Sequence, residues 1–134
     1  MILLDTCVLI DLKSYLLSPG ELYVASTLSR AELTFGVAQA SAAALKQERQ
    51  ARLANLDSWL EWRSFDRAAS DGYGIVAGAS GLTGARSRNK DALIAGQAYS
   101  LGAAVMTANL VDFAPFQQHV TVVPPTPRRK ACPN

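Results

Sequence analysis

Four acidic residues stand at the borders of short apolar or helix-forming segments, where their carboxylates could meet in one cleft. They are Asp5, Glu32, Asp91 and Asp112. Carboxylates that share a cleft repel one another, by roughly 4 kcal/mol for a pair about 4 Å apart near a protein surface. A divalent cation relieves this repulsion, and oxygen ligands favour Mg²⁺ or Mn²⁺ over Zn²⁺. Such an ion activates water and stabilises charge on a phosphoryl oxygen, so the pattern indicates hydrolysis of a phosphodiester.

Each acid also has a structural explanation when it is taken alone. Asp5 and Asp112 lie where a helix can begin. Ser29 and Glu32 match a capping box, in which the glutamate side chain bonds back to the serine backbone. Asp91 lies in the first turn of a predicted helix, where the helix dipole favours an anion. The functional interpretation therefore depends on a fold that brings the four acids together.

Strand-like and helix-like segments alternate along the chain. Strands are predicted at residues 1–4, 22–24, 61–65, 103–107 and 119–123, and helices at residues 6–15, 27–40, 41–59, 67–80, 91–98 and 109–116. The alternation predicts the α/β class, with a mostly parallel sheet of about four to five strands flanked by helices. Ligands of such sheets bind at the carboxyl ends of the strands, and Asp5 directly follows the first one.

Length and composition indicate one cytoplasmic domain. A chain of 134 residues is typical of a single domain, and no apolar run approaches the roughly 18 residues of a membrane span. Cys7 and Cys132 are too few for a disulfide framework, and we expect Cys7 to pack as a small apolar residue. The domain is predicted over residues 1–124, followed by a flexible tail over 125–134, because the prolines of residues 124–127 cannot continue a strand ladder.

The segments around the acids resemble those of PIN-domain nucleases, in particular the small toxin ribonucleases of VapC type. The resemblance rests on four segments in this order: Ile2-Leu3-Leu4-Asp5-Thr6 with Val8-Leu9, Ser29-x-x-Glu32-Leu33 with Gly36, Asp91-Ala92-Leu93-Ile94-Ala95 with Ala98, and Thr107-x-Asn109-x-x-Asp112-Phe113. It covers the chain from Met1 to about Pro124 and implies a PIN-like three-layer fold.

The resemblance implies a role for each acid. In the family, the acids that match Asp5, Glu32, Asp91 and Asp112 gather around one or two Mg²⁺ or Mn²⁺ ions. Asp5 and Asp91 would then be the primary metal ligands, and Asp112 would complete the metal site. Glu32 would bind a second ion or orient the water that attacks the phosphorus.

Three polar residues are implied as supports. Thr6, Thr107 and Asn109 would hold the acids and the water by hydrogen bonds. Family members often carry an acid at or near the position of Asn109. Because Asn109 is neutral, either Asp112 supplies the fourth carboxylate or the site has three strong ligands, and occupation of a second metal site stays open.

The resemblance further implies an endoribonuclease toxin that cuts RNA, inhibits translation, forms a homodimer and is neutralised by a cognate antitoxin protein. Arg86, Arg88 and Lys90 precede Asp91. They would contact RNA phosphates at the mouth of the site, or else form a solvated basic loop. The overall formal charge of +2 does not by itself indicate a nucleic-acid-binding protein.

A binding module is the main alternative. In this hypothesis a PIN-like domain with a weak or silent metal site acts through RNA or protein contacts, and the neutral Asn109 supports it. A receiver-like phosphoacceptor pocket around Asp5 fits less well, because such a pocket needs adjacent acids after the first strand and the chain has Asp5-Thr6.

Overall fold

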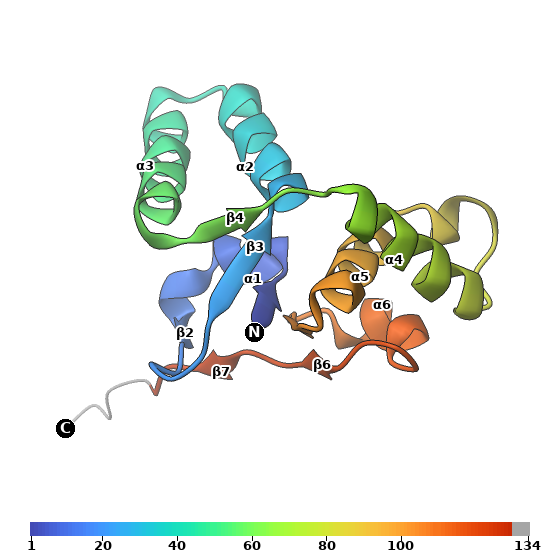
Figure 1. Cartoon of the computed structure of the whole chain (residues 1–134). Helices are drawn as coiled ribbons and strands as arrows, with labels where there is room; N and C mark the ends of the chain where they lie inside the picture. The colour runs from blue at the N-terminus through green and yellow to red at the C-terminus, as the bar shows by residue number, and fades with distance from the viewer. Residues whose placement is uncertain (130–134) are drawn as a thin grey trace.

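Five short parallel strands form the central sheet (Figure 1). The structure is a computed structural model that describes residues 1–129. The strands are β1 (Ile2–Leu4), β3 (Tyr23–Ser26), β4 (Glu61–Arg63), β5 (Ala104–Met106) and β6 (Val122–Val123). Their spatial order is β4-β3-β1-β5-β6, and every neighbouring pair is parallel. The predicted parallel α/β sheet is therefore confirmed, with β1 at its centre.

The central strands send neighbouring residues to opposite faces of the sheet, as successive side chains of a strand do. Leu3 of β1 belongs to the core on one face and Leu4 to the core on the other, and both are fully buried. The same division separates Val24 from Ala25 in β3 and Val105 from Met106 in β5. A parallel sheet that is apolar on both faces needs helices on both.

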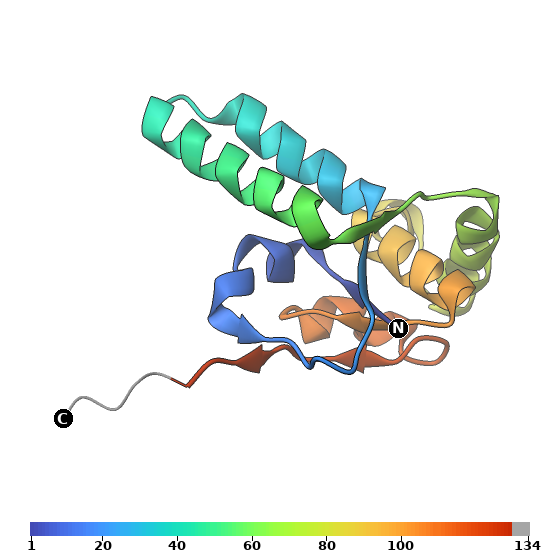
Figure 2. The same cartoon turned by 60° about the vertical axis from the view of Figure 1, so that its left-hand side comes forward.

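Two groups of helices supply this cover, so the molecule has three layers (Figures 1 and 2). The helices are α1 (Thr6–Ile10), α2 (Thr27–Gln39), α3 (Ala43–Trp59), α4 (Arg67–Ala79), α5 (Lys90–Leu101) and α6 (Leu110–Phe113). The core that contains Leu4 includes residues of α1, α2 and α3, whereas the core that contains Leu3 includes residues of α4, α5 and α6. Within residues 1–129, no helix combines the length and the apolar character that crossing a bilayer requires.

The antiparallel pair α2 and α3 extends away from the sheet (Figure 2). The Arg30 guanidinium donates two hydrogen bonds to the Asp57 carboxylate, at 3.0 and 2.8 Å. Arg49 donates to the backbone carbonyl of Gly36 at 2.6 Å. Exposed ion pairs add little stability, so their main effect is to fix how the two helices lie together. Because Glu32 lies on α2, this pair of helices positions one of the four acids.

The backbones of α4 and α5 approach each other closely. A Cβ atom added to Gly72 would lie 2.3 Å from the carbonyl oxygen of Gly96, and one added to Gly96 would lie 2.3 Å from the Cα of Tyr73. Glycine lowers helix propensity. At Gly72 and Gly96 the reduced helix propensity is offset by packing, because the absence of a side chain lets the backbones of α4 and α5 come into direct contact.

The N-terminal helix is shorter than predicted. It ends at Ile10, residues 12–14 form a 3₁₀ turn, and β2 (Tyr15–Leu16) pairs antiparallel with β7 (Thr126–Pro127). The ladder of β6 does stop at Val123, before the prolines, but Thr126 and Pro127 form a second, short edge ladder that was not predicted. The predicted flexible tail also begins too early at residue 125, since the Arg128 N–H donates to the carbonyl of Ser14 at 2.9 Å. Residues 130–134 lie outside the described residues.

Candidate active site

The carboxyl ends of three neighbouring strands bring distant segments of the chain together. Asp5 directly follows β1 and Thr107 directly follows β5, while Ser26 ends β3 and caps α2. Asp5 is 1% exposed and Thr107 is fully buried. Because β1 pairs with both β3 and β5, the first and last of the predicted site segments lie side by side.

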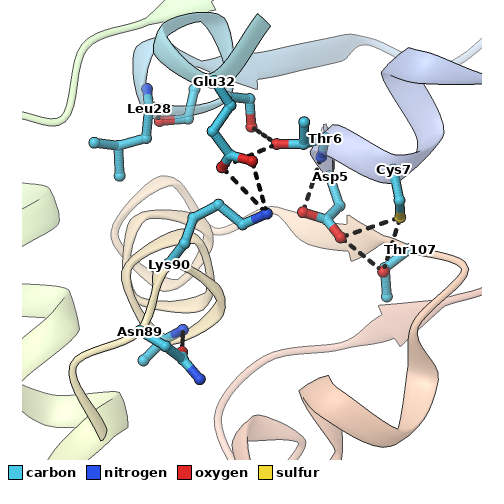
Figure 3. Close-up of polar contacts among 11 residues, drawn as sticks. Asp5, Thr6, Cys7, Leu28, Glu32, Asn89, Lys90 and Thr107 are labelled. Carbon is cyan, nitrogen blue, oxygen red and sulfur yellow. Dashed lines mark hydrogen bonds and ion pairs between the residues drawn. The ribbon is translucent and has the colours of Figure 1, made fainter. Parts of the chain in front are cut away.

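The buried carboxylate of Asp5 is held by three donors (Figure 3). Its Oδ1 accepts a hydrogen bond from the backbone N–H of Thr6 at 2.9 Å. Its Oδ2 accepts one from the Thr107 hydroxyl at 2.9 Å and one from the Cys7 thiol at 3.2 Å. Thr107 is itself fixed, because its Oγ1 accepts the backbone N–H of Asn109 at 3.0 Å. A charged acceptor with this many donors has a defined orientation.

Cys7 is a site residue that the sequence analysis did not identify. It packs against the apolar core, as expected, but its sulfur also contacts Asp5 and lies 3.5 Å from the Thr107 hydroxyl. Burial raises the pKa of the Cys7 thiol, and hydrogen bonds with Thr107 and the backbone of Ala108 offset only part of this effect. The thiol therefore remains protonated at neutral pH and can donate. Its position two residues after Asp5 was the available signal.

Glu32 reaches the site from the second turn of α2. The Thr6 hydroxyl donates to Ser29 Oγ at 2.8 Å and lies 3.5 Å from Glu32 Oε1. The capping-box explanation for Glu32 is wrong, because α2 begins one turn earlier and Ser26 is its N-cap, accepting from the backbone N–H of Leu28. Ser29, fully buried, links α1 to α2 instead.

Lys90 enters the same space from α5 (Figure 3). Its Nζ lies 3.1 Å from Glu32 Oε1 and 3.2 Å from Glu32 Oε2. Burial lowers the pKa of Lys90, but the hydrogen bond to Glu32 and the charges of Asp5, Glu32 and Asp91 outweigh it, and the pKa is raised overall. Lys90 was predicted to contact RNA phosphates, whereas here it forms an ion pair inside the acidic cleft.

Asp91 follows Lys90 in the first turn of α5, where the side chain of Asn89 caps the helix. Burial is the largest cause that raises the pKa of Asp91, and the negative charge of Asp5 is the next. The charges of Asp112 and Glu32 also raise this pKa, whereas Lys90 lowers it. The negative charges of the other three predicted acids therefore all act on Asp91.

The remaining predicted residues lie at the rim of the cleft. Asn109 and Asp112 are exposed; Asn109 stands at the start of α6 without a side-chain cap bond, and Asp112 lies in the first turn. Arg86 and Arg88 are exposed on the 3₁₀ turn and loop that precede α5. This arrangement gathers a buried Asp5, a half-buried Asp91 and an exposed Glu32 at one edge of the sheet and leaves the loop arginines open to solvent.

The chemistry of the cleft suits a hard divalent cation, because its side chains offer carboxylate and hydroxyl oxygens. Among residues 1–129, however, no three His, Cys, Asp or Glu side chains stand in a group that could hold a metal ion. Glu32 is instead paired with Lys90. A bound ion would therefore have to draw the ligands closer together than they lie here.

The raised pKa of Asp91 gives a testable pH dependence. When the pKa of a carboxyl group is higher in the folded state than in the unfolded state, its ionised form destabilises the fold. This destabilisation is complete above the folded-state pKa and disappears once the pH is below both pKa values. We expect Asp91→Asn to raise Tm by about 2 °C at pH 7 in the presence of a chelator, because the substitution removes the disfavoured Asp91 carboxylate. The gain is small because this carboxylate is partly solvated. The gain should disappear by about pH 3.5.

Thermal melts followed by circular dichroism across this pH range would measure the difference. Asp71→Asn, an exposed aspartate on α4, is the matched control and should leave Tm unchanged. A lower Tm for Asp91→Asn at pH 7 would mean that Asp91 stabilises the start of α5 more than its neighbours oppose it.

Comparisons with known proteins identify relatives by structure rather than by sequence. No family model matches the chain, and no curated protein matches it. A structure of VapBC2 from Rickettsia felis, bound to a promoter DNA fragment, matches with a TM-score of 0.74 and 23% identity over 92% of this chain and 98% of that chain. VapBC-5 from Mycobacterium tuberculosis matches with a TM-score of 0.68 and 24% identity over 92% and 96%.

FitAcB from Neisseria gonorrhoeae also matches, with a TM-score of 0.67 and 25% identity over 92% of this chain and 96% of that chain. These matches span nearly the full length of both compared chains, so the structural similarity is not limited to one motif. At such identities it is the fold that they establish. The chain thus has the PIN-like α/β fold found in VapBC toxin–antitoxin complexes, as its sequence predicted.

Proposed function

We propose that the protein is the ribonuclease toxin of a VapBC-type toxin–antitoxin pair and hydrolyses RNA with Mg²⁺ or Mn²⁺. The observation that carries this proposal is that the carboxylates of Asp5 and Glu32 come together at the carboxyl edge of the sheet, joined through Thr6. Lys90, which pairs with Glu32, brings the start of α5 and Asp91 to the same edge. A fold of this size tolerates mutually repelling carboxylates when they have a function there. The fold shared with VapBC and FitAcB complexes supports the same class of function.

In this proposal Asp5 and Asp91 hold the metal, and Asp112 contributes from the rim. The bound cation supplies a water of lowered pKa and a positive charge next to the phosphoryl oxygen. Glu32 orients the attacking water. Thr6, Thr107 and Asn109 act indirectly, since Thr6 and Thr107 donate to Asp5 and the Asn109 N–H fixes Thr107.

The partners follow from the same class of function. RNA phosphates would lie along the exposed Arg86 and Arg88 beside the cleft, where cations neutralise a polyanion. A cognate antitoxin would restrain the toxin, since the structural relatives were solved as complexes named VapBC and FitAcB. We also propose that the toxin forms a homodimer.

Three observations favour the binding module as a second candidate. The described residues offer no ready group of three metal-binding side chains, Asn109 is neutral, and Lys90 already neutralises Glu32. A domain with such a cleft could hold RNA or a protein partner without cutting. The two candidates differ in whether RNA is cleaved when a divalent ion is added.

The test is cleavage of end-labelled single-stranded RNA by the purified protein, with Mn²⁺, with Mg²⁺ and with a chelator. We expect fragments with either ion and none with the chelator, because the proposed reaction takes its activated water from the bound ion. Intact-mass spectrometry of the preparation would exclude a bound antitoxin. RNA that binds but stays intact in every condition would favour the binding module, and a single-stranded DNA of the same sequence would show whether the sugar matters.

A further inference from the structure

Lys90 occupies a position that local helix physics disfavours. It is the first residue of α5, where the helix dipole presents its positive end and favours anions over cations. Its side chain is 36% exposed, so it is partly withdrawn from water. Residues that break a local rule in this way are expected at functional sites.

The side chain compensates by pairing with the acids rather than with solvent. Its Nζ lies 3.1 and 3.2 Å from the two oxygens of Glu32, which comes from a segment 58 residues away in the chain. Figure 3 shows the ammonium group between the carboxylates of Glu32 and Asp5. The Lys90 ammonium group contacts both carboxylate oxygens of Glu32. It therefore occupies the position that a metal ion shared by Glu32 and Asp5 would take.

The charges of the cleft set how many further cations it can take. Asp5, Glu32, Asp91 and Asp112 supply four negative charges and Lys90 one positive charge. With one divalent ion bound, the net charge of these five side chains and the ion is −1. This small negative charge still allows an RNA phosphate to approach the site. A second divalent ion would make the cleft positive and would meet the ammonium of Lys90 beside Glu32, at a cost that grows with low local dielectric.

We propose that Lys90 takes the place of a second divalent cation beside Glu32, so that the cleft binds a single metal ion between Asp5 and Asp91. This inference rests on the proposed metal-dependent function. It makes Glu32 a partner of Lys90 rather than a metal ligand. It also explains why the neutral Asn109 is tolerated, since a site for one ion needs fewer carboxylates.

Mn²⁺ binding tests this directly, because free Mn²⁺ is counted by its paramagnetic resonance signal while isothermal titration gives affinity. We expect one Mn²⁺ per chain for the wild type and for Lys90→Arg, which keeps the charge. Lys90→Met keeps the apolar stem and removes the charge, so it should bind two ions, with the second site tightened by at least about tenfold. Arg88→Met, which removes a nearby charge outside the cleft, is the matched control and should bind one.

Circular dichroism and thermal melts would confirm that each variant is folded. Two Mn²⁺ ions bound to the wild type would overturn the inference and leave the proposed function standing. A single ion bound to Lys90→Met with unchanged affinity would also overturn it, and would return Lys90 to the role of an RNA contact. Absence of any Mn²⁺ binding to the wild type would instead remove the proposed metal-dependent function itself.

Discussion

Asp5→Asn is expected to lower the proposed Mn²⁺-dependent RNA cleavage by at least about 100-fold, while the fold stays intact. Asp5 is 1% exposed and lies at the centre of the cleft, at the end of the central strand. An amide has nearly the shape of the carboxylate but lacks its charge and offers one oxygen in place of two. The variant therefore loses the charge that the proposed metal site requires without leaving a cavity.

The measurement is the initial rate of cleavage at saturating Mn²⁺, with Mn²⁺ affinity as a second readout. Asp71→Asn, purified in the same way, makes the same chemical change on the exposed surface of α4 and should retain the full rate. Equal cutting by wild type and Asp5→Asn would show that a contaminating nuclease is responsible. A Tm close to that of the wild type would show that the lost rate is not caused by unfolding.

Gly96→Ala will destabilise the protein by about 3 kcal/mol or more, the upper range for overpacked cores, and lower Tm by about 10 °C. The new Cβ would lie 2.3 Å from the Cα and 2.5 Å from the N of Tyr73, which are backbone atoms that cannot rotate away. The helices α4 and α5 would have to separate. Because α5 carries Lys90 and Asp91, cleavage should fall as well.

Gly74→Ala is the matched control for this prediction. Gly74 lies on α4, is exposed, and has no atom within 4 Å of the position a Cβ would take. Alanine there should stabilise the helix by about 0.5–1 kcal/mol through propensity alone. Chemical denaturation of the two variants would measure opposite signs. A Gly96→Ala variant as stable as the wild type would mean that the helices can repack without loss.

The sequence predicted the elements whose signals are local. A four-residue apolar run was sufficient to identify β1, and the alternation of elements was sufficient to predict a parallel sheet with Asp5 at its carboxyl edge. Asp66 directly precedes the predicted helix of residues 67–80, and it caps α4 by accepting the backbone N–H of Ala69 at 2.9 Å. Local propensity does not explain Gly72 of α4, because its role lies in a close contact with α5.

The features that were missed depend on contacts between distant residues. β2 and β7 have two residues each, too few for any periodicity, and they pair across more than a hundred residues. The ion pair of Lys90 with Glu32 has no signature in either segment. The capping box failed for a related reason: Ser26 and Ser29 have the same chemistry, and only the end of β3 decides which of them begins the helix.

Because β1 lies in the middle of the sheet, the sheet can form only after strands from distant parts of the chain are available to pair with it. The hydroxyl that holds Asp5 belongs to Thr107, 102 residues later in the chain. While the chain is being synthesised, the N-terminal strand has no neighbour on the β5 side until residue 106 has emerged. Contacts of such long sequence separation form late. A nascent or truncated chain that stops before β5 therefore lacks both the neighbouring strand and the hydroxyl that hold the Asp5 carboxylate in place.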